Sequence, residues 1–189
     1  MIGASFPSVL AHAQRGDEQA FAILWRDLQP ALLRYFRVAT PAVTEDLAAE
    51  TWLGVIQGLE RFKGDERGFR SWVFTLARHR AVDWQRWKAR RPAMLVPVEL
   101  LDDQAAPDDP AAAALEALST RAALTLIAEL PHDQAEVVAL RLIAGLDVAQ
   151  VARIVGKRPG TVRVIAHRGL RRLAQLAGPV VLAHGSVTR

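Results

Sequence analysis

The segment from Pro92 to Glu116, "PAMLVPVELLDDQAAPDDPAAAALE", constrains the organisation of this chain more than any other feature. It contains four prolines and two Asp-Asp pairs, and it has no Lys or Arg. Because proline removes a backbone hydrogen-bond donor and neighbouring carboxylates repel one another, this composition favours a linker over a core element. We therefore expect an acidic flexible linker over residues 92–120 between two bodies, residues 1–91 and 121–178, with a tail at 179–189.

Both bodies are predicted to be helical. Ala and Leu supply much of the apolar content, whereas strict alternation of Val, Ile and Thr, the signal of a half-buried strand, is absent. The 189 residues include no cysteine, which excludes disulfides and cysteine-based zinc sites. The sequence thus predicts an all-α protein made of two small helical domains.

The first residues, "MIGASFPSVLAHAQRGDEQ", lack the basic start and the continuous apolar run of a signal peptide. No segment approaches the roughly 20 apolar residues that are needed to cross a bilayer. We expect a cytoplasmic protein that does not insert into membranes.

Charge is distributed unevenly along the chain. Residues 1–91 carry fourteen Lys/Arg and ten Asp/Glu, residues 92–120 carry none and six, and residues 121–189 carry ten and four. Two basic bodies joined by an acidic segment are typical of a protein that binds a polyanion at two places. Ordinary solvated helix faces remain the alternative on charge alone.

In the first body we expect a short helix that ends at Gly16, a second helix that Asp17 caps and that runs to about Gln29, and a third that Pro30 begins. Thr44 is predicted to cap the next helix. The inward stripe of that helix is expected to consist of Leu47, Thr51, Val55 and Leu59. Its outer side carries the acids Glu45, Asp46 and Glu50.

The segment "SWVFTLARHRAVDWQRWKARRP" follows a turn and belongs to a helix that we expect to begin at Phe69. At about 100° per residue, Trp72, Trp84 and Trp87 fall on one broad apolar face. We expect Trp72 to pack in the core, while Trp84 and Trp87 could either pack or touch an unpaired base. The residues able to meet phosphates lie on the other face or reach around to it: Arg78, His79, Arg80, Gln85, Arg86, Arg90 and Arg91.

The second body has the pattern of a helix-turn-helix. In "LDVAQVARIVG", Asp147 and Gln150 have the spacing of a capping box, and Gly156 ends the helix. A short turn leads to "TVRVIAHRGLRRLAQLA", whose predicted inward stripe is Val162, Ala166, Leu173 and Leu176. Residues 153–172 hold seven Lys/Arg and no acid, which suits the second helix to a DNA major groove. A helical hairpin with a basic surface is the alternative.

Three motifs now stand in order: "EDLAAETWLGVIQGLERF", "FRSWVFTLARHRAVDWQRW" and "LPHDQAEVVALRLIAGLDVAQVARIVGKRPGTVRVIAHRGLRRL". Together they resemble the second and fourth regions of bacterial RNA polymerase sigma factors of the compact extracytoplasmic-function (ECF) class of the sigma-70 family. The resemblance implies a non-catalytic initiation factor. Such a factor binds the largest and second-largest subunits of core RNA polymerase, recognises the minus-ten and minus-thirty-five promoter elements and promotes strand opening. Proteins of this kind often have an anti-sigma factor.

By this resemblance, Glu45, Asp46 and Glu50 would face the clamp helices of the largest polymerase subunit. The family often has glutamine where this chain has Ala49, so one expected polar contact is missing. The loop from Lys63 to Phe69 would receive an unstacked base of the minus-ten element. The minus-ten surface is then expected to comprise Lys63, Arg67, Phe69, Arg78, His79, Arg80, Trp84, Arg86, Trp87 and Arg90.

In the fourth region, Arg163, Val164, His167 and Arg168 match positions that meet the minus-thirty-five element. Arginine can pair bidentately with guanine, whereas Val164, where the family often has a small polar residue, can only touch a thymine methyl or pack apolar surface. Thr161 is also available to a ligand. Phosphate contacts are expected from Arg158, Arg171 and Arg172.

Two other classes of function are compatible with parts of this pattern. A stand-alone helix-turn-helix regulator remains the alternative, although it would not need the acidic helix. An enzyme acting on nucleic acid would need converging carboxylates or histidines, or a phosphate-binding loop, but the five histidines lack zinc-ligand spacing and no GxxxxGK[ST] is present. Asp83 is expected to pair with a neighbouring arginine. The sequence therefore predicts no enzymatic activity, no metal site and no cofactor.

Overall fold

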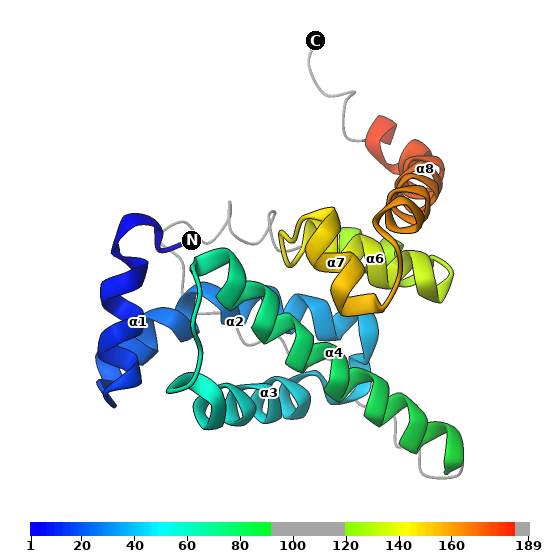
Figure 1. The fold of residues 1–189 in the computed structure, drawn as a ribbon. Helices are drawn as coiled ribbons and strands as arrows, with labels where there is room; N and C mark the ends of the chain where they lie inside the picture. The colour runs from blue at the N-terminus through cyan, green and yellow to red at the C-terminus, as the bar shows by residue number, and fades with distance from the viewer. Residues whose placement is uncertain (92–119, 184–189) are drawn as a thin grey trace.

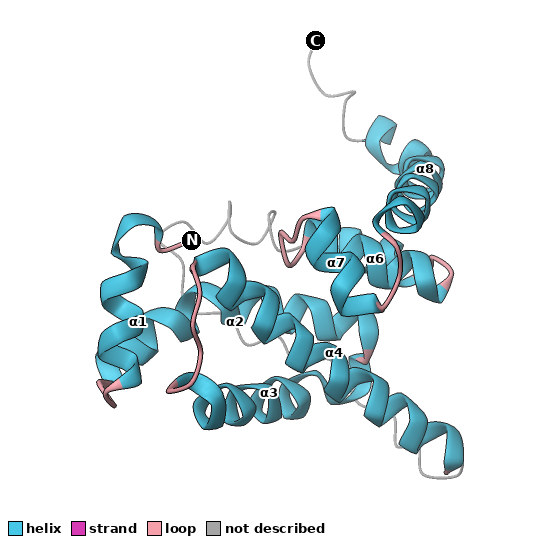
Figure 2. Ribbon diagram, viewed as in Figure 1, coloured by secondary structure: helices cyan, strands magenta, loops and turns pink. Residues whose placement is uncertain are grey.

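The computed structural model of the protein describes residues 1–91 and 120–183, with side chains described up to residue 177. The linker prediction therefore lies outside the described residues. Every regular element of the described part is helical (Figure 1, Figure 2), so the all-α prediction is confirmed. The elements are η1 (Gly3–Ser5), α1 (Phe6–Gln14), α2 (Glu18–Ala39), η2 (Pro41–Val43), α3 (Thr44–Leu59), α4 (Glu66–Arg90), a helical stretch at 120–128, α6 (His132–Leu142), α7 (Val148–Val155) and α8 (Pro159–Ala183).

Helix α2 is one long helix, so the prediction that Pro30 begins a separate helix is wrong. Asp17 caps it as predicted, and its Oδ1 accepts hydrogen bonds from the backbone N–H groups of Gln19 and Ala20. Pro30 stands inside the helix on the exposed side, where the missing N–H costs one bond. The helix continues because its buried residues keep their period through this point: Leu24, Leu28, Leu32, Tyr35 and Phe36.

The start of α3 also differs from the prediction. Thr44 is the first residue of α3 and not its cap; its hydroxyl donates to the carbonyl of Pro41 at 3.3 Å, and no side chain caps the helix. The predicted inward stripe is confirmed, because all four of its residues are buried: Leu47, Thr51, Val55 and Leu59.

Helix α4 begins three residues before Phe69, the predicted start. The carboxylate of Asp65 accepts from the backbone N–H of Gly68 at 2.7 Å and fixes the first turn at Glu66. Asp65 lies within "KGDERG". The glycines and charged residues around it favour a turn, so the sequence pattern alone does not identify Asp65 as an N-cap.

An aromatic cluster joins α4 to the rest of the first half. The ring of Trp72 stacks on that of Phe62 with centroids 5.1 Å apart, and Phe69 lies against Phe6, Phe62 and Trp72. A β-carbon at Gly58 of α3 would lie 2.7 Å from this indole, so α3 and α4 approach closely here. The packing role predicted for Trp72 is confirmed.

The second half contains the predicted helix-turn-helix, formed by α7 and α8. The capping box is present: the Asp147 side chain accepts from the N–H of Gln150, and the Gln150 side chain accepts from the N–H of Asp147. Gly156 ends α7 with φ of 67°, a left-handed conformation that glycine adopts without strain. Helix α8 begins at Pro159, two residues before the predicted start.

The two halves pack against each other in the described part. Helix α6 contacts α2, and α7 contacts α4, where the Gln150 amide donates to the carbonyl of Arg67 in the first turn of α4. Buried side chains of both halves belong to one continuous hydrophobic cluster. Among the described helices, none offers an apolar stretch of the length that a bilayer crossing requires.

Candidate nucleic-acid interface

The exposed side of α8 collects the residues predicted to meet the minus-thirty-five element. Val162 and Gly169 are buried on one side of α8, so the opposite side of the helix faces solvent. Within the described residues, none of the arginines on that side forms an ion pair. The exposed residues, including Arg158 in the turn before the helix, are Arg158, Thr161, Arg163, Val164, His167, Arg168, Arg171 and Arg172.

The basic side of α4 is more constrained. Arg86 pairs with Asp83 at 3.7 Å, as predicted for Asp83, and Arg80 lies 3.8 Å from Glu50 of α3. His79 and Arg90 are exposed. These four basic residues therefore stay available to a ligand, because exposed ion pairs are weak and exchange easily.

Arg78 differs from its neighbours on α4. Its guanidinium donates to both carboxylate oxygens of Glu136 on α6, with Nε to Oε1 at 2.9 Å and Nη2 to Oε2 at 3.4 Å. The side chains are only 23% and 13% exposed. Burial raises the pKa of the nearby Tyr35 hydroxyl above its usual range, and the Glu136 carboxylate adds to this shift. Arg78, which is predicted to contact DNA, is thus paired with an acidic side chain of the second half, Glu136.

The aromatic residues at the end of α4 are less buried than Trp72. Trp84 is half-buried, with Lys88 Nζ 5.0 Å from its ring centre, and Trp87 is 39% exposed beneath the guanidinium of Arg91. Cations over these rings are attracted by the π face. The structure therefore leaves Trp87 the more accessible of the two.

Within the predicted loop from Lys63 to Phe69, the residues from Glu66 onward form the first turn of α4. Lys63 and Arg67 are exposed, whereas Phe69 is only 2% exposed. The ring of Phe69 lies in the aromatic cluster under the loop. Its side chain supports the loop from the core and is not offered to a base in this conformation.

The outer side of α3 carries the three predicted acids, Glu45, Asp46 and Glu50, all exposed. The same side exposes Leu53 and Ile56, at 58% and 55%, which the sequence reasoning missed. Their signal was present in the sequence, since both fall outside the Leu47 to Leu59 stripe. The arrangement is an apolar centre with an acidic margin.

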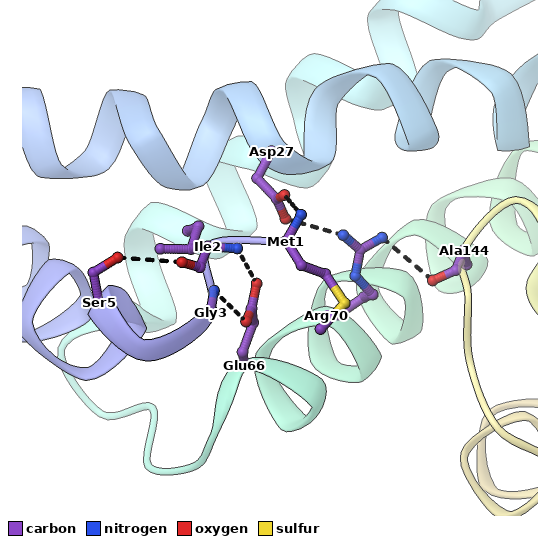
Figure 3. Close-up of polar contacts among 8 residues, drawn as sticks. All are labelled: Met1, Ile2, Gly3, Ser5, Asp27, Glu66, Arg70 and Ala144. Carbon is purple, nitrogen blue, oxygen red and sulfur yellow. Dashed lines mark hydrogen bonds and ion pairs between the residues drawn. The ribbon is translucent and has the colours of Figure 1, made fainter.

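A polar network around Arg70 links three parts of the chain (Figure 3). Its guanidinium pairs with Asp27 of α2 at 2.9 Å and donates to the carbonyl of Ala144, in the α6–α7 loop, at 3.4 Å. The amine of Met1 also contacts Asp27. The Glu66 carboxylate accepts hydrogen bonds from the backbone N–H groups of Ile2 and Gly3. Sequence reasoning missed this network because its partners are 43 and 74 positions apart.

The described residues contain no group of three or more His, Cys, Asp or Glu side chains that could hold a metal ion.

Comparison with known proteins decides the family. Residues 24–91 match the family model for Sigma-70 region 2, and residues 113–173 match that for Sigma-70, region 4. The chain belongs to the sigma-70 family. Region 2 therefore corresponds to the first half, which contains α3 and α4. Region 4 corresponds to the second half, which contains the helix-turn-helix.

Relatives place this sigma factor in the ECF class. It is 35% identical over 181 residues to the ECF RNA polymerase sigma factor ShbA of Streptomyces griseus, covering 90% of this chain and 94% of ShbA. It is 34% identical over 171 residues to BldN of Streptomyces coelicolor, covering 89% of this chain but 64% of BldN. SigD of Mycobacterium tuberculosis is 32% identical over 180 residues, with 92% and 84% covered. The sigma factor thus directs RNA polymerase to promoters, and is an initiation factor rather than a catalyst.

Solved structures share the fold. CnrH, in complex with the cytosolic domain of CnrY, matches with a TM-score of 0.62 over 93% of this chain and 98% of CnrH. RpoE of Bartonella quintana, in complex with the anti-sigma factor NepR, matches with a TM-score of 0.65 over 84% and 96%. Both are 21% identical to this sigma factor.

Proposed function

We propose that this sigma factor uses three separate surfaces in initiation. The outer side of α3 binds core polymerase, the basic side of α4 and the loop before it take the minus-ten element, and the exposed side of α8 reads the minus-thirty-five element. The residues are those predicted from the sequence, with Leu53 and Ile56 added on α3 and with Phe69 as a support beneath the loop. We divide the chain as predicted, with the second region in residues 1–91 and the fourth in 121–178.

One observation carries the assignment of α3: an exposed apolar pair stands among acids on a helix that has no basic residue. Protein interfaces combine an apolar centre with a polar rim, and complementary charge sets the register of the partners. DNA would be repelled by Glu45, Asp46 and Glu50. A stand-alone regulator has no use for this surface, whereas a basic, apolar-centred protein surface fits it.

The two DNA surfaces differ in chemistry. On α8, Arg163 and Arg168 can pair with guanine edges in the major groove, and Arg171 and Arg172 can hold phosphates. On α4, cationic side chains flank Trp84 and Trp87, a combination that suits single-stranded bases stacked on aromatic rings. The first surface reads duplex DNA, and the second holds a strand that has been opened.

The test is reconstitution. Purified sigma factor is mixed with core RNA polymerase, and the transcripts made from fragmented genomic DNA are sequenced. We expect start sites that share two spaced upstream motifs, and their loss when Arg163 and Arg168 are both replaced by alanine. Tight, sequence-specific binding to promoter fragments without polymerase, and no polymerase-dependent transcripts, would favour the stand-alone regulator.

The cytoplasm is the compartment that we propose for this activity. An anti-sigma factor is a further proposed partner, supported by the shared fold with CnrH and RpoE, which were solved with CnrY and NepR. A candidate is tested by adding it to the reconstituted reaction, where it should abolish the transcripts that depend on this sigma factor.

A further inference from the structure

Helix α1 has no part in the three surfaces proposed above. The residues that match the family model for Sigma-70 region 2 begin at residue 24, after this helix. Helix α1 packs on α2 and buries Phe6, Leu10 and Ala13. Both of its ends contact the minus-ten loop or the residues next to it, where the loop is residues 63–69 and includes the first turn of α4.

The C-terminal end of α1 holds the chain just before the loop. Gln14, the last residue of α1, is half-buried, and its Nε2 donates to the carbonyls of Leu59 at 2.9 Å and Phe62 at 2.8 Å. Leu59 ends α3, and Phe62 directly precedes the loop. The two N–H groups of one amide therefore bind two backbone carbonyls between α3 and the loop. This contact fixes the direction in which the chain leaves α3.

The residues before α1, together with its first residue, hold the other end of the loop. The Glu66 carboxylate accepts hydrogen bonds from the backbone N–H groups of Ile2 at 2.5 Å and Gly3 at 3.0 Å (Figure 3). The ring of Phe6 lies against that of Phe69, with the two centroids 5.8 Å apart. Residues 2–14 thus hold the loop from both sides.

Between these two ends, the loop rests on the ring of Phe62. A β-carbon built on Gly64 would lie 3.0 Å from this ring, and one built on Gly68 would lie 3.8 Å from it. The ring itself is stacked on Trp72. Because Gln14 binds the carbonyl of Phe62, the same residue of α1 also holds the support beneath the loop.

We propose that residues 2–14 are a positioning element for the minus-ten loop, and that Gln14 is its central positioning residue. This proposal rests on the proposed role of the loop in taking a minus-ten base. A loop that is already in its binding shape does not have to be ordered by the base, so it binds the base more tightly. Without the two hydrogen bonds of Gln14, the loop holds this shape for a smaller fraction of the time, and its affinity for the base falls by that fraction.

The test measures what each base of the strand contributes to binding. Holoenzyme, formed from the full chain and core polymerase, is titrated into labelled single strands with the minus-ten sequence of a reconstituted promoter. One abasic nucleotide is placed at each position in turn. The abasic penalty is the ratio of the dissociation constants of the abasic and intact strands, and it is expected to be about 5- to 150-fold for a base stacked on the parent chain. A change in general affinity for the strand cancels in this ratio.

Three substitutions separate the donors of Gln14 from other effects. Gln14→Met keeps the length of the side chain and removes both donors, and Gln14→Ala is a second variant without a donor. Gln14→Lys supplies N–H donors again, since an ammonium group can bind the last carbonyls of a helix. Gln19→Met, the same replacement at an exposed position of α2, is the matched control. Circular dichroism checks that each variant is folded.

We expect Gln14→Met and Gln14→Ala to reduce the abasic penalty at one position by about 3-fold or more, which corresponds to a loop in its binding shape for about a third of the time or less. The penalties at the other positions should stay as in the parent. Gln14→Lys should restore the penalty, and Gln19→Met should leave every penalty unchanged.

Unchanged penalties in both donor-free variants, or an equal reduction at all positions, would overturn the positioning role and leave the proposed function intact. A parent holoenzyme without an abasic penalty at any position would instead refute the proposed minus-ten role, and the positioning role with it.

Discussion

Gly169 of α8 lies directly against Val138 of α6. A β-carbon built on Gly169 would stand 2.7 Å from Cγ2 of Val138, and 3.4 Å from the β-carbon of Gln134. Only a hydrogen atom fits at this crossing, so the backbone of α8 at Gly169 packs directly against the side chain of Val138 on α6. The contact sets how deeply α8 is seated, and therefore how its basic side is presented to DNA.

Replacing Gly169 by alanine should destabilise the helix-turn-helix half. Alanine gains about 1 kcal/mol of helix propensity over glycine, but forcing a methyl group into a packed contact costs about 1–3 kcal/mol. We expect a net loss in the free energy of unfolding, measured by denaturant titration with circular dichroism. Gly160→Ala in the same helix is the control, since no atom lies within 4 Å of its added carbon, and it should be neutral or stabilising. Equal stability of the two variants would contradict the role given to Gly169.

Gly169 also shows where sequence reasoning stops. Periodicity predicted the inward stripe of α8 from its apolar residues, and Val162 is indeed buried. Gly169 lies in the middle of that stripe and is buried, while Ala166 and Leu173 are only half-buried. A hydrophobic pattern marks the face that packs but not the depth of the contact, which depends on the residue opposite.

The elements with local signals were predictable, and those that depend on distant partners were not. The capping box of Asp147 and Gln150 and the left-handed Gly156 are set by neighbours within a few residues, and both were predicted. The prediction for Pro30 is wrong because the local preference of proline for a first helical turn is outweighed by the buried residues of α2 on both sides of it. The pairing of Arg78 with Glu136 spans 58 positions and leaves no trace in either local sequence.

The tryptophans of α4 should separate into structural and DNA-binding roles. Trp72→Ala should lower the free energy of unfolding by about 2–4 kcal/mol, because it removes the ring that stacks on Phe62. Trp87→Ala should cost less than about 1 kcal/mol of stability, since Trp87 is 39% exposed, but should weaken binding of the minus-ten single strand by about 1–3 kcal/mol. Denaturant titration measures the change in stability. Fluorescence anisotropy of a labelled minus-ten single strand, titrated with the polymerase-bound factor, measures the change in DNA affinity.

Trp87→Phe is the matched variant, because it keeps an aromatic face for stacking and should retain most of the affinity. A Trp87→Ala variant that loses stability as Trp72→Ala does, and binds the strand normally, would assign Trp87 to packing.

The arginines of α8 should differ in what they contribute. Arg163→Ala should cost about 1–3 kcal/mol on the preferred minus-thirty-five sequence and relax the preference at one base pair. Arg172→Ala should weaken binding to all sequences about equally and reduce the salt dependence of log K by about one. Both side chains are exposed, so stability should be unaffected. Competition binding against single-base variants at several salt concentrations distinguishes the two, and interchangeable profiles would remove the distinction between base and phosphate contacts.

The outer side of α3 should be essential for polymerase binding and dispensable for folding. Leu53→Asp places a charge at the apolar centre of this side, where it would be desolvated by the partner and would add to the existing acids. Because Leu53 is 58% exposed, unfolding should be unchanged, whereas affinity for core polymerase should fall by 2 kcal/mol or more, about 30-fold. Ile23→Asp on α2, another exposed apolar position, is the control and should bind normally. Affinity is measured by titrating labelled sigma factor with core polymerase. Normal affinity in Leu53→Asp would remove α3 from the interface and leave the acids Glu45, Asp46 and Glu50 as ordinary charges on a solvated helix face.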